Sequence, residues 1–208
     1  MALLGTIRGY VLAGGGSTRF GQDKALIKVN GQPMLLRMQR LLASVVTDVA
    51  VIASPEKYAS FGVSCIPDLW LGQGPLGGII TALRSSAAAT NIPRWNLIIG
   101  CDMPFLSREW LAHLAKLSLV SDVDVLVPRS INGLEPLCAC WRTNAADQLQ
   151  KEFDSGTRKI TDAMEKLRME IVDEPDWKRF DKAGRLFWNM NTPKDYEEAR
   201  RLLNAEHA

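Results

Sequence analysis

The residues with the clearest chemical capacity lie near the start of the chain, in a glycine-rich stretch followed by polar and charged side chains. Three consecutive glycines, residues 14–16, precede Ser17, Thr18, Arg19 and Lys24. A glycine turn lets successive backbone N–H groups approach phosphate oxygens, because no Cβ stands in the way. The two hydroxyls add donors, and the two basic residues add positive charge. The stretch therefore predicts a binding site for a polyphosphate.

Two common phosphate-binding patterns do not fit this stretch. The dinucleotide pattern G-x-G-x-x-G matches Gly14 and Gly16 but meets Arg19 in place of its third glycine. The P-loop pattern requires Gly-Lys followed by Ser or Thr, whereas this chain has Gly21-Gln22-Asp23. Neither dinucleotide-dependent hydride transfer nor a P-loop NTPase is favoured.

Asp102 is a second candidate, because it lies two residues beyond the most apolar strand-like run of the chain, residues 97–100. A carboxylate at the tip of that strand would face the same edge of a sheet as the glycine-rich stretch. Mg²⁺ keeps several waters and needs only one or two protein carboxylates beside substrate phosphates. Asp102 is therefore our candidate metal ligand. The alternative is an aspartate that merely begins the turn at Pro104.

Two further segments follow strand-like runs. Asp68 ends the sequence Ile66-Pro67-Asp68, and it belongs either to a nucleotide site or to a solvent-exposed turn. The glycine-rich segment 72–78 leads into a predicted helix, whose free N–H groups favour an anion or a carbonyl group. Gly77 and Gly78 would let a flat ligand approach the backbone closely. A purely structural turn is the alternative for this segment.

An alternation of strands and helices has to position these candidates. Apolar and β-branched runs predict strands at residues 9–13, 48–53, 63–66, 97–100, 123–127 and 137–141. Apolar periodicity and capping residues predict helices that begin at Pro33, near Ile79, and after Ser107, Thr157 and Thr192. A short hairpin or loop is expected over residues 25–32, because Asn30-Gly31 is a strong turn dipeptide.

This alternation predicts an α/β fold with a Rossmann-like, mostly parallel twisted sheet and helices on both faces. We expect a single domain, residues 1–208, in which a strand near the end of the chain runs antiparallel. In such a sheet, loops after the carboxyl ends of the strands collect the ligand groups. The glycine-rich stretch, Ser54, Asp68 and Asp102 each follow a predicted strand, so they are expected at one edge.

The composition argues against several other kinds of protein. The 208 residues suffice for one sizeable core, and the formal net charge of +2 gives no reason to expect nucleic acid or a membrane as partner. The four cysteines form no C-x-x-C pair and there are two histidines, so a structural zinc site is poorly supported. We expect buried, reduced thiols. With neither a signal-peptide pattern nor about 20 consecutive apolar residues, we expect a cytoplasmic protein.

The first stretch resembles the motif L-A-G-G-x-S-x-R-x-G-x-D-K of the molybdenum cofactor guanylyltransferase family of nucleotidyltransferases. The resemblance extends over nearly the whole chain, through the segments Gly74-Pro-Leu-Gly-Gly78, Cys101-Asp-Met-Pro-Phe105 and Asn189-Met-Asn-Thr-Pro193. Related cytidylyltransferases differ at the segment Gly74-Pro-Leu-Gly-Gly78 and have L-A-A-G in the first motif. The two motifs together therefore point to guanine as the base.

The resemblance implies a nucleotide-diphospho-sugar-transferase-like fold and a specific reaction. The terminal phosphate of molybdenum-bearing molybdopterin would attack the α-phosphorus of GTP, giving molybdopterin guanine dinucleotide and pyrophosphate. Mg²⁺ on Asp102 would bridge phosphate oxygens, while Arg19 and Lys24 would stabilise charge on the pyrophosphate. Molybdoenzyme apoproteins or their chaperones are implied as further partners.

The resemblance also assigns residues to the two substrates. The implied nucleotide-binding residues are Leu12, Ala13, Gly14, Gly15, Lys24, Ser54, Asp68, Gly77, Gly78 and Asp102. Asn189 and Asn191 are expected near the pterin, although Asn191 or Thr192 could instead only cap the last helix. Relatives often have an asparagine at the end of the second strand, and in this chain Ser54 occupies that region.

Two alternative functions remain open at the level of sequence. One is a related nucleotidyltransferase that uses CTP or transfers to another phosphorylated acceptor. The other is an accessory protein that binds the nucleotide or the cofactor without turnover. Pure binding does not require a metal-bridged α-phosphate, so the presence of both Lys24 and Asp102 argues for the enzyme.

Overall fold

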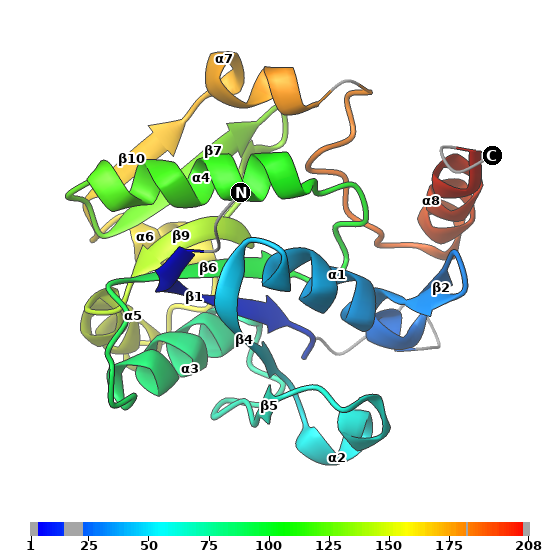
Figure 1. Cartoon of the computed structure of the whole chain (residues 1–208). Coiled ribbons are helices and arrows are strands. Elements are labelled where there is room, and N and C mark those ends of the chain that lie inside the picture. The colour runs from blue at the N-terminus through cyan, green and yellow to red at the C-terminus, as the bar shows by residue number, and fades with distance from the viewer. Residues whose placement is uncertain (1–3, 15–22, 182, 206–208) are drawn as a thin grey trace.

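The computed structural model describes residues 4–14, 23–181 and 183–205, and these form a layered α/β structure (Figure 1). Within them the main sheet has the strand order β10-β7-β9-β6-β1-β4-β5, and β8 pairs with β7 alone. Its strands are β1 (Leu4–Leu12), β4 (Val46–Ile52), β5 (Cys65–Ile66), β6 (Trp95–Gly100), β7 (Val125–Ser130), β8 (Gly133–Leu134), β9 (Cys138–Arg142) and β10 (Met169–Val172).

The centre of the sheet is parallel. β1 lies between β4 and β6, and Val11 pairs with Val51 on one side and with Ile99 on the other. β9 lies antiparallel between β6 and β7, whereas β10 again runs parallel to β7. The predicted mostly parallel sheet with an antiparallel strand late in the chain is confirmed.

Helices cover both faces of the sheet, as predicted (Figure 1). One buried cluster includes residues of α1, α4, α7 and α8, and the other includes residues of α3, α5 and α6. The helices are α1 (Met34–Ala43), α2 (Pro55–Tyr58), α3 (Pro75–Ala87), α4 (Arg108–Val120), α5 (Ala145–Asp154), α6 (Ile160–Met164), α7 (Glu174–Trp177) and α8 (Pro193–Ala205). No helix of the described residues is both long and apolar enough to cross a membrane.

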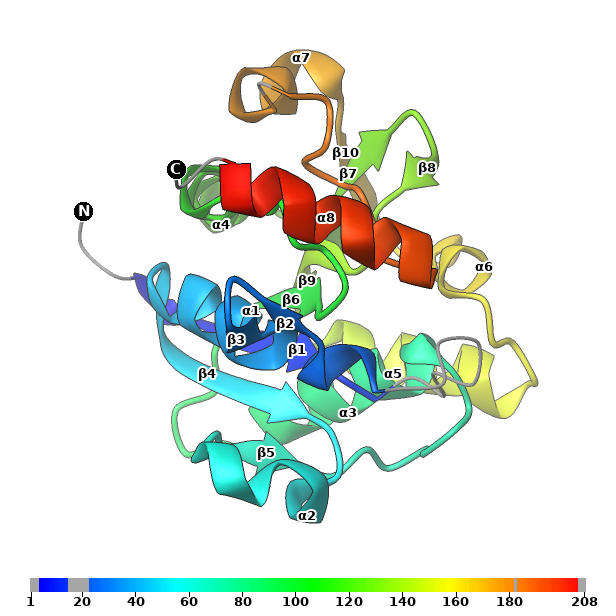
Figure 2. The same ribbon diagram turned by 90° about the vertical axis from the view of Figure 1, so that its right-hand side faces the viewer.

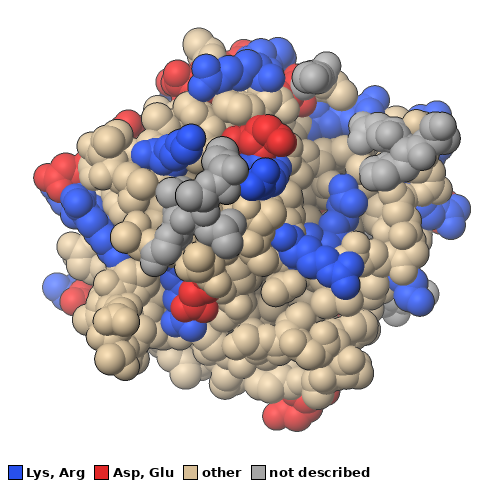
Figure 3. Space-filling view, in the orientation of Figure 1, with Lys and Arg blue, Asp and Glu red and all other residues tan. Residues whose placement is uncertain are grey.

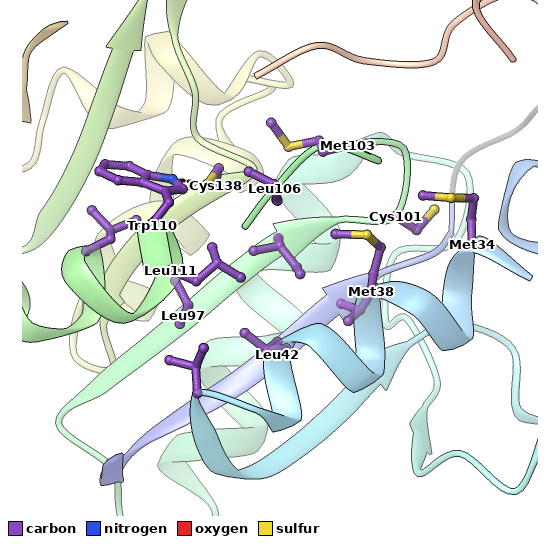
Figure 4. Close-up of a cluster of buried hydrophobic side chains, with 14 of the residues drawn as sticks. Met34, Met38, Leu42, Leu97, Cys101, Met103, Leu106, Trp110, Leu111 and Cys138 are labelled. Atoms are coloured by element: carbon purple, nitrogen blue, oxygen red, sulfur yellow. Dashed lines mark hydrogen bonds between the residues drawn. The ribbon is translucent and has the colours of Figure 1, made fainter. Parts of the chain in front are cut away.

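The core on the side of α1 and α4 joins these helices to the central strands. Met38 and Leu42 of α1 point toward Leu97 of β6 and toward α4 (Figure 4). Trp110 of α4 is fully buried, and its indole Nε1 donates to Cys138 Sγ at 3.3 Å. All four cysteines are free: Cys101, Cys138 and Cys140 are buried, and Cys65 is partly exposed.

Local sequence signals explain several element boundaries. Asn30 and Gly31 have φ values of 50° and 74°, which closes the predicted hairpin between β2 (Lys28–Val29) and β3 (Gln32–Pro33). Ser107 Oγ accepts from the Trp110 backbone N–H at 3.2 Å at the start of α4. Thr192 Oγ1 accepts from Asp195 N at 3.2 Å at the start of α8. Both predicted caps are confirmed.

Other boundaries differ from the sequence predictions. α3 begins at Pro75 rather than near Ile79, because proline suits the first helical position, so Gly77 and Gly78 lie inside its first turn. The prediction of Thr157 as a helix cap is wrong: α6 begins at Ile160 and has no side-chain cap. The elements α5, α7 and β10 were not predicted.

Candidate active site

A pocket of about 470 Å³ opens at the carboxyl ends of the parallel strands β1, β4 and β6. Its lining comes from segments that are far apart in sequence. The described residues that line it are Leu12, Ala13, Gly14, Asp23, Lys24, Ala25, Ile52, Asp68, Gly72, Gly74, Pro75, Gly78, Gly100, Cys101, Asp102 and Leu137. Gly14, Asp68 and Asp102 thus converge at one edge of the sheet, as predicted.

Asp102 lies two residues beyond the end of β6, and backbone hydrogen bonds fix its position. The preceding Cys101 N donates to Leu12 O at 3.2 Å, and Asp102 O accepts from Met190 N at 2.8 Å. The Asp102 side chain is 24% exposed. Burial raises the pKa of its carboxyl group, and the nearby charge of Lys24 partly offsets this effect. The pocket therefore holds a carboxylate whose negative charge is only partly compensated.

Lys24 connects the two ends of the chain at this carboxylate. Its Nζ lies 3.8 Å from Asp102 Oδ2 and donates to Asn191 Oδ1 at 3.0 Å. Asn191 directly precedes Thr192 and α8, and this helix packs beside β2, where Tyr196 Oη donates to Lys28 O at 2.9 Å (Figure 2). The C-terminal helix therefore helps to position the ammonium group beside the acid.

Asp68 is oriented by the segment that follows it. Its Oδ1 accepts from the Trp70 backbone N–H at 3.0 Å and from Thr81 Oγ1 at 3.1 Å. Thr81 lies on α3 and is 2% exposed. A Cβ built on Gly14 would lie 3.9 Å from Asp68 Oδ2, so this oxygen faces the end of β1. Asp68 is therefore held in the pocket and is not a freely solvated turn residue.

The charges of the pocket favour a polyanion only if a cation accompanies it. Its charged residues within the described ranges are Asp23, Lys24, Asp68 and Asp102. Asp23 is paired with Lys57 Nζ at 2.6 Å, which leaves two carboxylates and one ammonium group. Figure 3 shows both acidic and basic side chains on one face of the molecule, and most of the charged side chains on the right-hand half of this face are basic.

Comparison with known proteins identifies the kind of site. Residues 9–170 match the family model of the MobA-like NTP transferase domain. The chain belongs to this family. Its sequence is 33% identical over 193 residues to a probable molybdenum cofactor guanylyltransferase of Pelotomaculum thermopropionicum, covering 92% of this chain and 91% of that protein. It is therefore a nucleotidyltransferase, and the resemblance recognised in its motifs is confirmed.

Two further proteins give the same result. A molybdenum cofactor guanylyltransferase of Desulfosudis oleivorans is 29% identical over 201 residues, with 96% of each chain covered. The crystal structure of molybdopterin-guanine dinucleotide biosynthesis protein A from Archaeoglobus fulgidus superposes with a TM-score of 0.81 at 28% identity. That match covers 95% of this chain and 99% of the other. The fold of this MobA-like transferase is therefore that of its family.

Several residues predicted for the site lie elsewhere in the structure. Ser54 Oγ donates to Glu56 Oε2 at 2.7 Å, and Ser54 is not part of the pocket lining. Asn189 Nδ2 donates to Phe187 O at 3.2 Å, and Asn189 is likewise outside the lining. Gly77 packs against Trp70, where an added Cβ would lie 2.9 Å from the Trp70 Cβ. Gly15 and Arg19 lie outside the described residues.

The sequence patterns also missed residues that the structure brings to the site. Burial and the charge of Asp102 raise the pKa of the Glu135 carboxyl group, although a hydrogen bond from Ser130 Oγ at 2.6 Å opposes the shift. Tyr58 Oη donates to Asp23 Oδ2 at 2.7 Å. The sequence predicts the segment that begins at Glu135 mainly as the entry to a strand, because Glu135 precedes Pro136 and an apolar run. No local signal marks Tyr58 or Thr81.

Proposed function

We propose that this MobA-like transferase moves the guanylyl group of GTP to molybdenum-bearing molybdopterin. The relatives that span nearly its whole length carry the name molybdenum cofactor guanylyltransferase. The observation that carries most weight is the pairing of Asp102 with Lys24 in a pocket at the carboxyl ends of the parallel strands. This arrangement suits a substrate that brings both phosphates and a metal ion.

The proposed transfer needs no covalent enzyme intermediate. A terminal phosphate oxygen of molybdopterin attacks the α-phosphorus of GTP, and the bond from that phosphorus to the bridging oxygen breaks. Pyrophosphate leaves with the electron pair, and molybdopterin guanine dinucleotide is formed. The protein contributes by holding both substrates in line and by offsetting the negative charge of the phosphates.

Mg²⁺ fits the pocket as the cation of this reaction. No group of three or more His, Cys, Asp or Glu that could hold a metal occurs among the described residues. Mg²⁺ does not need such a group, since one or two carboxylates and substrate phosphates suffice. Asp102 would hold the ion, with Asp68 as the second carboxylate of the pocket. When bound, Mg²⁺ supplies positive charge to the phosphate oxygens.

Other residues of the chain would bind the phosphates, the nucleoside and the pterin. Lys24 donates to the phosphates in place of its contact with Asn191, and Arg19 adds a second positive charge. Gly14, Gly15, Leu12 and Ala13 present backbone to the nucleotide, as does Gly78. Asp68 meets the base or ribose, whereas Asn191 faces the pterin. Among these, Leu12, Ala13, Gly14, Lys24, Asp68 and Gly78 line the pocket together with Asp102.

The product has to be passed on, and we propose molybdoenzyme apoproteins or their chaperones as its receivers. We expect neither nucleic acid nor a membrane as a partner, because the net charge is only +2. The proposed location of the reaction is the cytoplasm.

Nucleotide choice is the decisive test of this proposal. The purified protein is incubated with Mg²⁺, molybdenum-loaded molybdopterin and each of GTP, CTP, ATP and UTP labelled at the α-phosphate. We expect dinucleotide and an equal amount of pyrophosphate from GTP, and at least about tenfold slower product formation from the others. Each unpaired buried group costs roughly 1–3 kcal/mol with a wrong base. Faster product formation from CTP, or stoichiometric binding without turnover, would support the alternatives instead.

A further inference from the structure

Tyr58 lies at the end of α2, outside the pocket lining, yet its hydroxyl reaches the pocket wall from behind. The side chain is 1% exposed. Its Oη donates to Asp23 Oδ2 at 2.7 Å and lies 3.3 Å from Ala13 O. Burial, followed by the Asp23 carboxylate, raises the pKa of the Tyr58 hydroxyl. The hydroxyl therefore stays protonated and remains a hydrogen-bond donor.

Asp23 is held from three directions by this arrangement. Besides the Tyr58 hydroxyl, Lys57 Nζ lies 2.6 Å from Asp23 Oδ2, and the Ala25 backbone N–H donates to Asp23 Oδ1 at 3.0 Å. The Asp23 side chain is 14% exposed. Its negative charge is thus satisfied by groups behind the pocket and is not directed at a ligand. Asp23 acts as an anchor for its own backbone.

The two residues that Tyr58 contacts stand on either side of the glycine-rich sequence. Ala13 follows the end of β1, and Asp23 directly precedes Lys24, with residues 14–22 between them in the sequence. Both Ala13 and Asp23 line the pocket. One hydroxyl from α2 therefore contacts two residues of the pocket wall, one at the end of β1 and one beside Lys24. Holding binding residues in place before the ligand arrives lowers the entropy cost of binding.

We propose that Tyr58 is a positioning residue for triphosphate binding, and that it acts through Asp23 on Lys24. This inference rests on the proposed function in one respect, namely that the pocket takes a nucleoside triphosphate. Lys24 Nζ lies between Asp102 and Asn191, and its backbone is joined directly to the anchored Asp23. Without the Tyr58 hydroxyl, the Asp23 carboxylate keeps only the half-exposed Lys57 as its partner on α2. The Lys24 ammonium group is then less well held.

Tyr10 offers a matched control for the loss of a buried hydroxyl. It is 0% exposed, and its hydroxyl forms a hydrogen bond with Ser86 Oγ at 2.7 Å. Its side chain belongs to the buried cluster of α3 and α5, away from the pocket. Tyr58→Phe and Tyr10→Phe therefore remove the same atom from similarly buried rings. Only the first should affect the ligand.

The first experiment measures GTP affinity by calorimetric titration in the presence of Mg²⁺, with inorganic triphosphate as a second probe. We expect Tyr58→Phe to weaken binding of both by about tenfold, and Tyr10→Phe to change it less than twofold. The melting temperatures of both variants measure how much the loss of a buried hydroxyl destabilises the fold in each case. Equal affinity losses in the two variants, or no loss in Tyr58→Phe, would show that the Tyr58 hydroxyl only stabilises the core.

The second experiment asks whether Tyr58 acts through Asp23. In the Asp23→Asn background, Tyr58→Phe should weaken GTP binding less than twofold, because the charged acceptor is already absent. A full tenfold effect in that background would overturn the proposed route. If the wild type prefers another nucleoside triphosphate, the proposed function fails while both comparisons proceed with that nucleotide. A wild type that binds no triphosphate would overturn the proposed function and this inference together.

Discussion

At the scale of single residues, the site depends on one carboxylate that the fold keeps partly buried. Asp102 has an ammonium group 3.8 Å away and no closer cation among the described residues. Its pKa is raised chiefly by burial, so the ionised form is disfavoured in the free protein. A divalent cation would relieve this cost. The burial that raises the pKa of Asp102 therefore favours metal-dependent binding.

We predict that Asp102→Asn separates activity from stability. Product formation should fall roughly 10³-fold, because several kcal/mol of charge stabilisation by the ion are lost. Added Mg²⁺ should no longer tighten GTP binding in a calorimetric titration.

Asp102→Asn should lower activity but raise the stability of the ligand-free protein. Since the folded-state pKa of Asp102 is raised, its favourable contribution is full below the ordinary carboxyl pKa and is lost as pH rises through the raised value. The ligand-free variant should therefore melt at a higher temperature than the wild type at pH 8, and the advantage should shrink at low pH. A variant that keeps normal Mg²⁺-dependent turnover would remove Asp102 from the mechanism.

At the scale of elements, the position of Asp102 depends on how β6 ends. Gly100 is the last residue of β6, and a Cβ there would lie 2.8 Å from Asp102 Oδ1 and 3.6 Å from the Leu137 Cβ. A strand that ended in any other residue would push the carboxylate aside. The glycine is therefore needed for close approach at the site, and its φ is not in the left-handed region.

Gly100→Ala should reduce activity more than stability. The added methyl group meets the mobile end of one side chain, so we expect at least a tenfold loss of turnover with a loss of under about 1 kcal/mol in unfolding free energy. Gly9→Ala provides the contrast, since its Cβ would lie 2.8 Å from Leu42 and Val46 atoms in the core. That variant should lose about 1–3 kcal/mol in urea unfolding. The prediction fails if Gly100→Ala is as active as the wild type.

A second element-scale prediction concerns the edge strand β10, which is attached to β7 through Asp124 and Arg168. Arg168 donates to the Asp124 carboxylate from its backbone N at 3.1 Å, from Nε at 3.2 Å and from Nη2 at 2.8 Å. These hydrogen bonds lower the pKa of Asp124. Asp124→Asn should cost about 0.5–1 kcal/mol of unfolding free energy at pH 7, because the Asp124 side chain is mostly buried but Arg168 is screened by solvent.

The pH dependence of that loss follows from the sign of the shift. A lowered folded-state pKa gives stability that is present above the ordinary pKa and is lost as pH falls through the lowered value. The difference between wild type and Asp124→Asn should therefore disappear in acid. Asp147→Asn is the control, because its ion pair with Arg84 is exposed and should contribute little. Similar losses in both variants would contradict the special role of Asp124.

At the scale of the whole molecule, the early and late parts of the chain are connected in two ways. They share the main sheet, and the C-terminal helix α8 packs on an early hairpin. β9 lies between β6 and β7, so it connects the parallel strands that border the pocket to the later strands β7 and β10. α8 comes back to the hairpin of β2 and β3, where Asn30 Nδ2 donates to Leu203 O at 3.3 Å. The site includes groups from both ends of the chain for this reason.

We therefore predict that the chain unfolds as one unit, as expected for the single domain inferred from the sequence. Scanning calorimetry should give one transition whose calorimetric and van't Hoff enthalpies agree. Saturating GTP with Mg²⁺ should raise the whole transition by mass action. Two transitions, of which the ligand shifts only one, would indicate separate domains.

Elements with local signals could be predicted from the amino-acid sequence. Apolar runs located β1, β4 and β6, Ser107 and Thr192 were identified as caps, and the position of Asp102 after a buried strand predicted its place in the pocket. The sequence patterns did not predict α5. This helix has no side-chain cap, and its buried face begins with the small residues Ala145 and Ala146. Contacts between residues that are distant in sequence could not be predicted in this way, because they depend on the tertiary structure. Lys24 and Asn191 are 167 positions apart, and Tyr58 reaches Asp23 from a different element. Periodicity reports which face of a segment is buried, whereas strand order determines what lies against it.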